Sequence, residues 1–256
     1  MIRTLKLAVK ALLARFGVVI FKRSTGIYIA ENETPALALR LCGIAEPMVV
    51  DGGAHRGSFV EAIRKLSPGA RFLCFEPDPL LADALRTKFF RNPEVQIVPS
   101  ALGSACGTAD FNINRSRANN SLLSSSGDTT GRLGEIMETV ERIEVEVTTL
   151  DEALRRAEFG SCDILKLDLQ GHDLQALAGA AHSLRTVRVV IVEVWYAPVY
   201  TDSVTFLQIF NLLHDSGFVI YTLAGLHYST ADRLLWSDAI FVRADLPVLI
   251  EPLAIT

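Results

Sequence analysis

The chain has 256 residues, half of them hydrophobic and 21% charged, which is typical of an ordered globular protein and excludes a disordered one. Its formal net charge of −4 is unevenly spread: residues 1–23 carry six basic and no acidic side chains, which leaves 19 basic against 29 acidic residues elsewhere. An acidic body is a poor partner for a phosphate backbone, so we expect no nucleic-acid substrate.

The basic segment 1–23 is predicted to form an amphipathic helix. We favour a helix packed on the body of the protein. The alternative is peripheral attachment to an anionic membrane surface, which would place a cytoplasmic protein at the inner face of the membrane. The four cysteines lack zinc-binding spacing, and reduced thiols without a metal centre suit a cytoplasmic location: Cys42, Cys74, Cys106 and Cys162.

After a predicted helix at 35–45, short apolar strands alternate with helices. Strands are predicted at 48–50, 71–75 and 95–98, and helices at 58–66 and 80–90. This alternation indicates a parallel sheet with helices on both faces, the doubly wound α/β class.

The middle of the chain interrupts this rhythm. Residues 108–113 and 143–149 alternate polar with apolar side chains, so they predict an inserted antiparallel β-hairpin. The polar stretch 114–142 between them is expected to be a long loop, and loops of this length are usually functional or disordered. For Arg115 and Arg117, within it, we favour a solvated surface position.

The alternation then resumes to the end of the sheet. Helices are predicted at 150–157, 174–181 and 204–215, and strands at 163–167, 187–194, 218–223 and 239–243. The residues between the last two strands show no strong helix signal for a crossover, so these strands should pair as a hairpin, which makes one of seven strands antiparallel. The predicted organisation is an N-terminal helical extension (1–46), one α/β domain (47–245) and a tail (246–256).

A glycine-rich turn joins the first strand to its helix. Ligands of doubly wound sheets bind at the carboxyl ends of the strands, where glycines let the backbone approach them. Ala54 departs from the usual dinucleotide-binding spacing, and a plain tight turn is the alternative. We predict that the turn binds a ligand through Asp51, Gly52, Gly53, Ala54 and Gly57.

A second candidate follows the second strand, at Glu76 and Pro77. An acidic residue there, about twenty residues beyond a glycine turn, can accept both ribose hydroxyls of a nucleoside, whether NAD or S-adenosyl-L-methionine. The alternative is a carboxylate at a helix N-terminus, and Asp78 suits that position better than Glu76.

These two sites resemble the FkbM family of methyltransferases when taken with five later motifs. The motifs are Ser100–Gly103, Asn120–Leu122, Thr149–Asp151, Lys166–Asp173 and Ser237–Arg243. The resemblance runs from about residue 48 to 243. It implies a seven-stranded, Rossmann-like class I methyltransferase sheet, S-adenosyl-L-methionine as cofactor, and methylation of an oxygen.

The resemblance also implies residue roles. The turn at Asp51, Gly53 and Gly57 would hold the methionine part of the cofactor, and Glu76 would bind the ribose. The adenine pocket would be lined by Ser100, Ala101 and Leu102, and Asp168 would face the reacting centre. Gln170 and His172 stand where the family often has acidic residues, which weakens any assignment of a base at position 170.

A hydroxyl acceptor gains from a nearby general base. Asp168 is our first candidate because it ends a strand, with capping of the following helix as its alternative. His55 and His172 are weaker candidates, since a surface imidazole explains each. Glu193 ends a very apolar strand, where packing alone does not explain a carboxylate; capping of a helix is its alternative.

The predicted function is therefore O-methylation of a glycan or a small polyketide-like acceptor. Aromatic residues expected at the same face would suit such an acceptor, with packing in the core as the alternative: Trp195, Tyr196, Tyr200, His227 and Tyr228. An NAD-dependent oxidoreductase and an inactive cofactor-binding scaffold are the alternatives. The terminal hairpin offers an edge through which two copies could pair as a homodimer.

Overall fold

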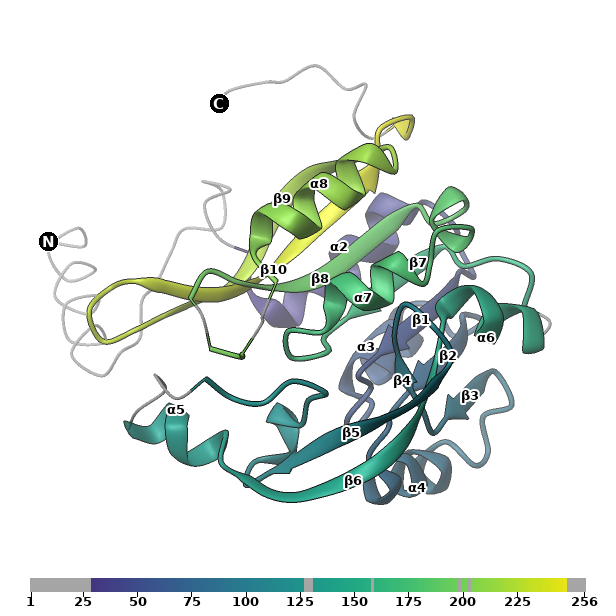
Figure 1. Ribbon diagram of the computed structural model, residues 1–256. Coiled ribbons are helices and arrows are strands. Elements are labelled where there is room, and N and C mark those ends of the chain that lie inside the picture. The colour runs from purple at the N-terminus through teal and green to yellow at the C-terminus, as the bar shows by residue number, and fades with distance from the viewer. Residues whose placement is uncertain (1–28, 127–130, 158, 198, 202–203, 248–256) are drawn as a thin grey trace, which may run out of the picture.

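A computed structural model describes residues 29–126, 131–157, 159–197, 199–201 and 204–247. Its main sheet has the strand order β3-β2-β1-β7-β8-β10-β9 (Figure 1). β10 runs antiparallel to both β8 and β9, whereas the strands from β3 to β8 pair in parallel, so the predicted doubly wound sheet with an antiparallel terminal strand is confirmed. The strands are β1 Met48–Gly52, β2 Arg71–Phe75, β3 Val95–Val98, β7 Ile164–Leu167, β8 Val189–Trp195, β9 Phe218–Tyr228 and β10 Leu234–Arg243.

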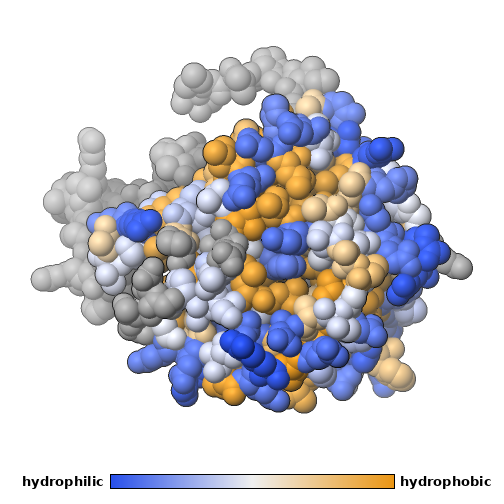
Figure 2. Space-filling view, viewed as in Figure 1, coloured by the Kyte–Doolittle hydropathy of each residue, from blue (hydrophilic) through white to orange (hydrophobic). Residues whose placement is uncertain are grey.

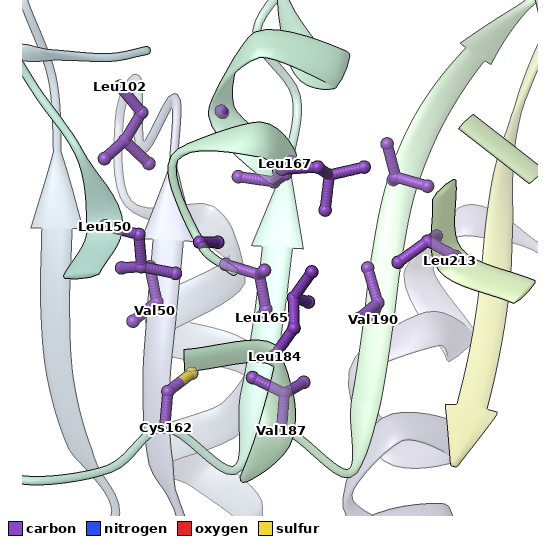
Figure 3. Packing of buried hydrophobic residues seen from close by; sticks show 14 of the residues in the cluster. Val50, Leu102, Leu150, Cys162, Leu165, Leu167, Leu184, Val187, Val190 and Leu213 are labelled. Atoms are coloured by element: carbon purple, nitrogen blue, oxygen red, sulfur yellow. The ribbon is translucent and has the colours of Figure 1, made fainter. Parts of the chain in front are cut away.

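Helices cover both faces of this sheet, because successive side chains of a strand point to opposite sides. Val50, Leu165 and Val190 are paired across β1, β7 and β8 and belong to one core. Figure 3 shows them packed with Leu150, Leu184 and Leu213. Three helices contribute buried side chains to that core: α6 Leu150–Arg156, α7 Asp173–Ala178 and α8 Phe206–Asp215. On the opposite face of the sheet, three other helices contribute buried side chains to a second core: α2 Thr34–Cys42, α3 Ser58–Leu66 and α4 Pro79–Lys88.

The predicted insertion is present as part of a small second sheet. β5 Gly107–Asn114 and β6 Thr139–Thr148 form the expected antiparallel pair. A third strand, β4 Ala101–Leu102, pairs in parallel with the end of β6. The pairing brings residues 101–102, which lie shortly after the end of β3, beside the insertion.

The stretch 114–142 is not the uninterrupted loop that we predicted. Within its described part it contains the 3₁₀ turn η3 Arg117–Asn119 and the helix α5 Gly131–Ile136, and β6 begins at Thr139. A six-residue helix holding two glycines has neither the length nor the propensity that produces a helical pattern.

The terminal hairpin extends beyond the predicted strands. β9 continues to Tyr228 and β10 begins at Leu234, and their pairing shifts register between Leu234 and Trp236 and again before Asp238. These irregularities break the two-residue alternation that identifies a strand in a sequence, so only 218–223 and 239–243 were predicted.

The predicted basic helix at 1–23 lies outside the described residues, as does most of the predicted tail. Among the helices that are described, none is both long and apolar enough to span a bilayer. Figure 2 shows apolar residues gathered over α8 among charged and polar ones, and Leu207 of that helix is 61% exposed. A folded surface normally exposes such apolar area.

Candidate active site

The turn after β1 is shaped by glycines at the carboxyl edge of the sheet. Gly53 has φ +75°, and a Cβ atom there would lie 2.1 Å from the backbone oxygen of Asp168. The amides of Gly53 and Ala54 both donate to the backbone oxygen of Phe75 at 3.0 Å. Only glycine fits this position, because the turn lies directly against the end of β7.

A cavity of about 270 Å³ opens beside this turn, slightly below the roughly 300–1,000 Å³ usual for small-molecule sites. Most predicted ligand-binding residues line it: Asp51, Gly53, Ala54, Glu76, Pro77, Ser100, Ala101, Leu102 and Asp168. Gly52 and Gly57 do not. A Cβ atom at Gly52 would meet Leu167, and one at Gly57 would meet Phe89, so these two glycines allow close packing around the turn.

Glu76 is held rigidly at the end of β2. Its Oε2 accepts a hydrogen bond from the amide of His55 at 2.8 Å, and its Oε1 accepts one from the amide of Asp78 at 3.0 Å. The side chain is 4% exposed, and burial raises the pKa of Glu76 to about 7. Each oxygen keeps a further lone pair that can accept from a ligand hydroxyl.

This pKa predicts that cofactor affinity depends on pH. The ionised carboxylate makes the stronger hydrogen bonds, and with a pKa near 7 its ionised fraction falls about tenfold between pH 8 and pH 6. We expect the Kd for S-adenosylhomocysteine, measured by calorimetry, to rise by about the same factor over that range. A Glu76→Gln variant should bind more weakly and with little pH dependence. An equal pH dependence in both proteins would assign the titration to another group.

Asp78 caps the N-terminus of α4 by accepting a hydrogen bond from the amide of Leu80. The sequence favoured Asp78 over Glu76 for this capping position. Its other oxygen accepts from Asn120 Nδ2 at 2.9 Å and pairs with Arg117. Our preference for a solvated Arg117 was therefore wrong: it lines the cavity and holds the insertion against α4. Arg115 does lie at the surface, paired with Glu138.

Lys166 is the main residue of the site that sequence reasoning missed. Its Nζ lies 3.2 Å from Asp51 Oδ1, 3.5 Å from Asp168 Oδ2 and 3.3 Å from the backbone oxygen of Gly53. Burial acts to lower the pKa of Lys166, but the surrounding carboxylates outweigh it and raise the pKa. The available signal was a lysine within an apolar interior strand, where an unpaired charge is not tolerated.

Asp168 does not cap α7, because the N-cap residue of that helix is His172 and no side-chain cap hydrogen bond is present there. Gln170 Nε2 donates to Asp168 Oδ1 at 2.7 Å and to Glu193 Oε2 at 2.9 Å. Tyr200 donates its hydroxyl proton to Gln170 Oε1 at 2.5 Å. The amide of Gln170 is therefore fixed in one orientation, and it holds the Asp168 carboxylate at the cavity wall.

Glu193, a predicted catalytic candidate, lies behind Gln170 rather than on the cavity wall. It also accepts from Trp195 Nε1 at 2.9 Å and caps no helix. Burial raises the pKa of Glu193 well above its usual range, and neighbouring acids add to the shift. The geometry gives it a supporting position and no direct access to a ligand.

His55 and His172, the remaining candidates, both line the cavity. Burial lowers the pKa of each ring, so both are neutral at pH 7. Within the described residues, His172 Nδ1 and Ser100 Oγ are buried and have no hydrogen-bond partner. Buried polar atoms normally find one, so these two atoms on the wall fit a polar ligand.

The predicted aromatic surface does not form at this cavity. Trp195 and Tyr200 are buried and pack edge to face, with ring centroids 5.5 Å apart. His227 stacks on Trp236 at 4.5 Å, in the extended hairpin. These rings stabilise the region around the end of β8 instead of lining the site.

Comparisons with known proteins find similar chains. The model of the methyltransferase FkbM domain matches residues 51–220. Similar proteins include the 2-O-methyltransferase NoeI of Sinorhizobium fredii, 25% identical over 66% of this chain and 71% of its own length. Another is the hexuronic acid methyltransferase AglP of Haloferax volcanii, 29% identical over 60% and 62%.

Among solved structures, the fold is similar to that of methyltransferase FkbM from Methylobacillus flagellatus. The TM-score is 0.51 at 15% sequence identity, and the match covers 77% of this chain. The chain spans 44% of the length of that protein. At this identity the likeness concerns the fold.

Proposed function

The chain belongs to the FkbM methyltransferase family, and from that premise we propose that it methylates a hydroxyl oxygen of a glycan or a small polyketide-like molecule. Its cofactor is S-adenosyl-L-methionine, as in the family. Oxygen as the target is supported by the name of the relative NoeI, a 2-O-methyltransferase, and a sugar acceptor by that of AglP, a hexuronic acid methyltransferase.

One observation carries the proposal: a single cavity joins Glu76 to Asp168. Glu76 presents fixed carboxylate oxygens suited to a ribose diol. Asp168 presents a carboxylate that is held from one side by Gln170 and from the other by Lys166. A nucleoside site and a candidate proton acceptor therefore share one wall.

We assign the following roles. When bound, the cofactor supplies an electrophilic methyl group on a sulfonium sulfur. Glu76 and Pro77 hold the ribose, Ser100, Ala101 and Leu102 line the adenine pocket, and the turn at Asp51 and Gly53 receives the methionine part.

Asp168 accepts the proton of the acceptor hydroxyl as the oxygen gains the methyl group. Correct placement of the two reactants supplies much of the rate enhancement in such a transfer, and the base adds to it. Lys166 positions Asp168 and prevents repulsion between it and Asp51. In this assignment His55 and His172 contact ligand as neutral rings, and Glu193 supports Gln170.

We place the reaction in the cytoplasm, a compartment that suits the free, buried thiols of Cys42, Cys74 and Cys162. We also propose membrane contact through residues 1–23 and formation of a homodimer through the terminal hairpin. Sedimentation with anionic vesicles and analytical ultracentrifugation test them separately.

The test of the function is transfer of a tritiated methyl group to an extract of the source organism. We expect label in a product that withstands alkaline hydrolysis, as a methyl ether does and a methyl ester does not. Label that is released by alkali would contradict transfer to a hydroxyl. Cofactor binding without any transfer would favour the inactive-scaffold alternative.

A further inference from the structure

A second cavity, of about 550 Å³, adjoins the first. Lys166 and Asp168 belong to the walls of both, together with residues at the start of α3. A molecule in the second cavity would therefore reach Asp168 from a space that Glu76 does not line. This is the position that an acceptor must occupy if Asp168 takes its proton.

Asp238 of β10 forms part of the wall of this second cavity. In the strand register it lies opposite Glu193 of β8. It also lies two residues before Ile240, whose side chain packs in the core shared with α2 and α3. Side chains two residues apart on a strand share a face, so Asp238 points to the same side as Lys166. Its carboxylate makes no hydrogen bond or ion pair with any other residue that the structure describes.

Thr34, the first residue of α2, supplies an independent observation. It lines the second cavity and is 3% exposed. Its Oγ1 is buried and has no hydrogen-bond partner among the described residues. A buried hydroxyl is normally paired, and a ligand hydroxyl in this cavity would pair it.

The charges of the wall restrict the ligand. The described acidic residues that line the second cavity are Glu31, Asp168 and Asp238, and the one described cation is Lys166. Lys166 is already paired with Asp51 and Asp168. Among the residues that the structure describes, a carboxylate or phosphate would therefore meet like charges and find no free cation, which discriminates against anionic molecules.

We propose that the second cavity is the acceptor site, that Thr34 and Asp238 bind acceptor hydroxyls there, and that it accepts polyhydroxylated molecules without acid groups. The inference rests on the proposed methyltransferase function and adds to it a substrate class. It distinguishes this chain from its hexuronic acid methyltransferase relative.

The first test fractionates the acceptor. An extract of the source organism is separated on an anion exchanger at neutral pH, and each fraction is incubated with the full-length protein and tritiated S-adenosylmethionine. Label in the unbound fraction is the expected result, and label confined to the bound, anionic fraction would overturn the proposal. Failure to bind S-adenosylhomocysteine, measured separately, would instead overturn the methyltransferase function.

The second test compares Thr34→Val and Asp238→Asn with the matched exposed controls Thr108→Val and Asp110→Asn on β5. We expect the amount of the labelled fraction needed for half-maximal rate to rise at least fivefold in the two cavity variants. Their Kd for S-adenosylhomocysteine should stay within twofold of wild type, which also shows that they fold. Unchanged half-saturation in both cavity variants would refute the assigned contacts.

Discussion

Replacing Lys166 by methionine should lower the free energy of unfolding by about 3–5 kcal/mol, the usual effect of removing one partner of a buried ion pair. The side chain of Lys166 is 15% exposed and that of Asp51 is 1% exposed. Without the ammonium group, Asp51 keeps a buried charge with no partner. Urea denaturation followed by circular dichroism measures the change.

Two further proteins make this test specific. Lys65→Met changes an exposed lysine of α3 and should alter stability by less than about 0.5 kcal/mol. The double variant Asp51→Asn, Lys166→Met removes both charges and should recover part of the loss. A Lys166→Met protein as stable as the Lys65→Met control would mean that the pair contributes nothing to stability.

Replacing Asp168 by asparagine should reduce the rate of methyl transfer by about 10²–10⁴-fold, the usual contribution of a general base. Asparagine keeps the size of the side chain, and its oxygen can still accept from Gln170, so the site should keep its shape. The rate at saturating acceptor and the Kd for S-adenosylhomocysteine are measured together. We expect the Kd to change by no more than a few-fold.

The matched control is Asp110→Asn, which makes the same chemical change at an exposed position on β5 and should leave the rate unchanged. An Asp168→Asn protein with a normal rate would remove Asp168 from the role of base. If that happened, the neutral imidazoles of His55 and His172 would be the next side chains on the cavity wall to test.

Much of the fold could be predicted because its signals are local. The predicted bounds of α3, β2 and β3 agree with the structure, since each is a short apolar or amphipathic run between turn residues. The antiparallel position of β10 could also be predicted, because the residues between the last two predicted strands carry no helix pattern for a crossover. Helix α5 and the extension of the terminal hairpin carry no such local pattern.

The cavity could be anticipated for a related reason. Turns after parallel strands meet at one edge of the sheet, so Asp51, Glu76 and Asp168 were expected to converge. The contacts within that edge could not be predicted. Lys166 and Asp51 are 115 positions apart, and Tyr200 reaches Gln170 from a loop beyond β8. Such pairs depend on side-chain packing between distant segments.

The most direct test of the site is calorimetric titration of the purified protein with S-adenosylhomocysteine, after any co-purified ligand has been removed. We expect saturable binding at one site, greatly weakened in the Glu76→Gln variant, because the ribose hydroxyls lose their charged acceptor. No binding by the wild-type protein, or equal binding by the variant, would contradict a cofactor site at the carboxyl ends of β1, β2 and β7.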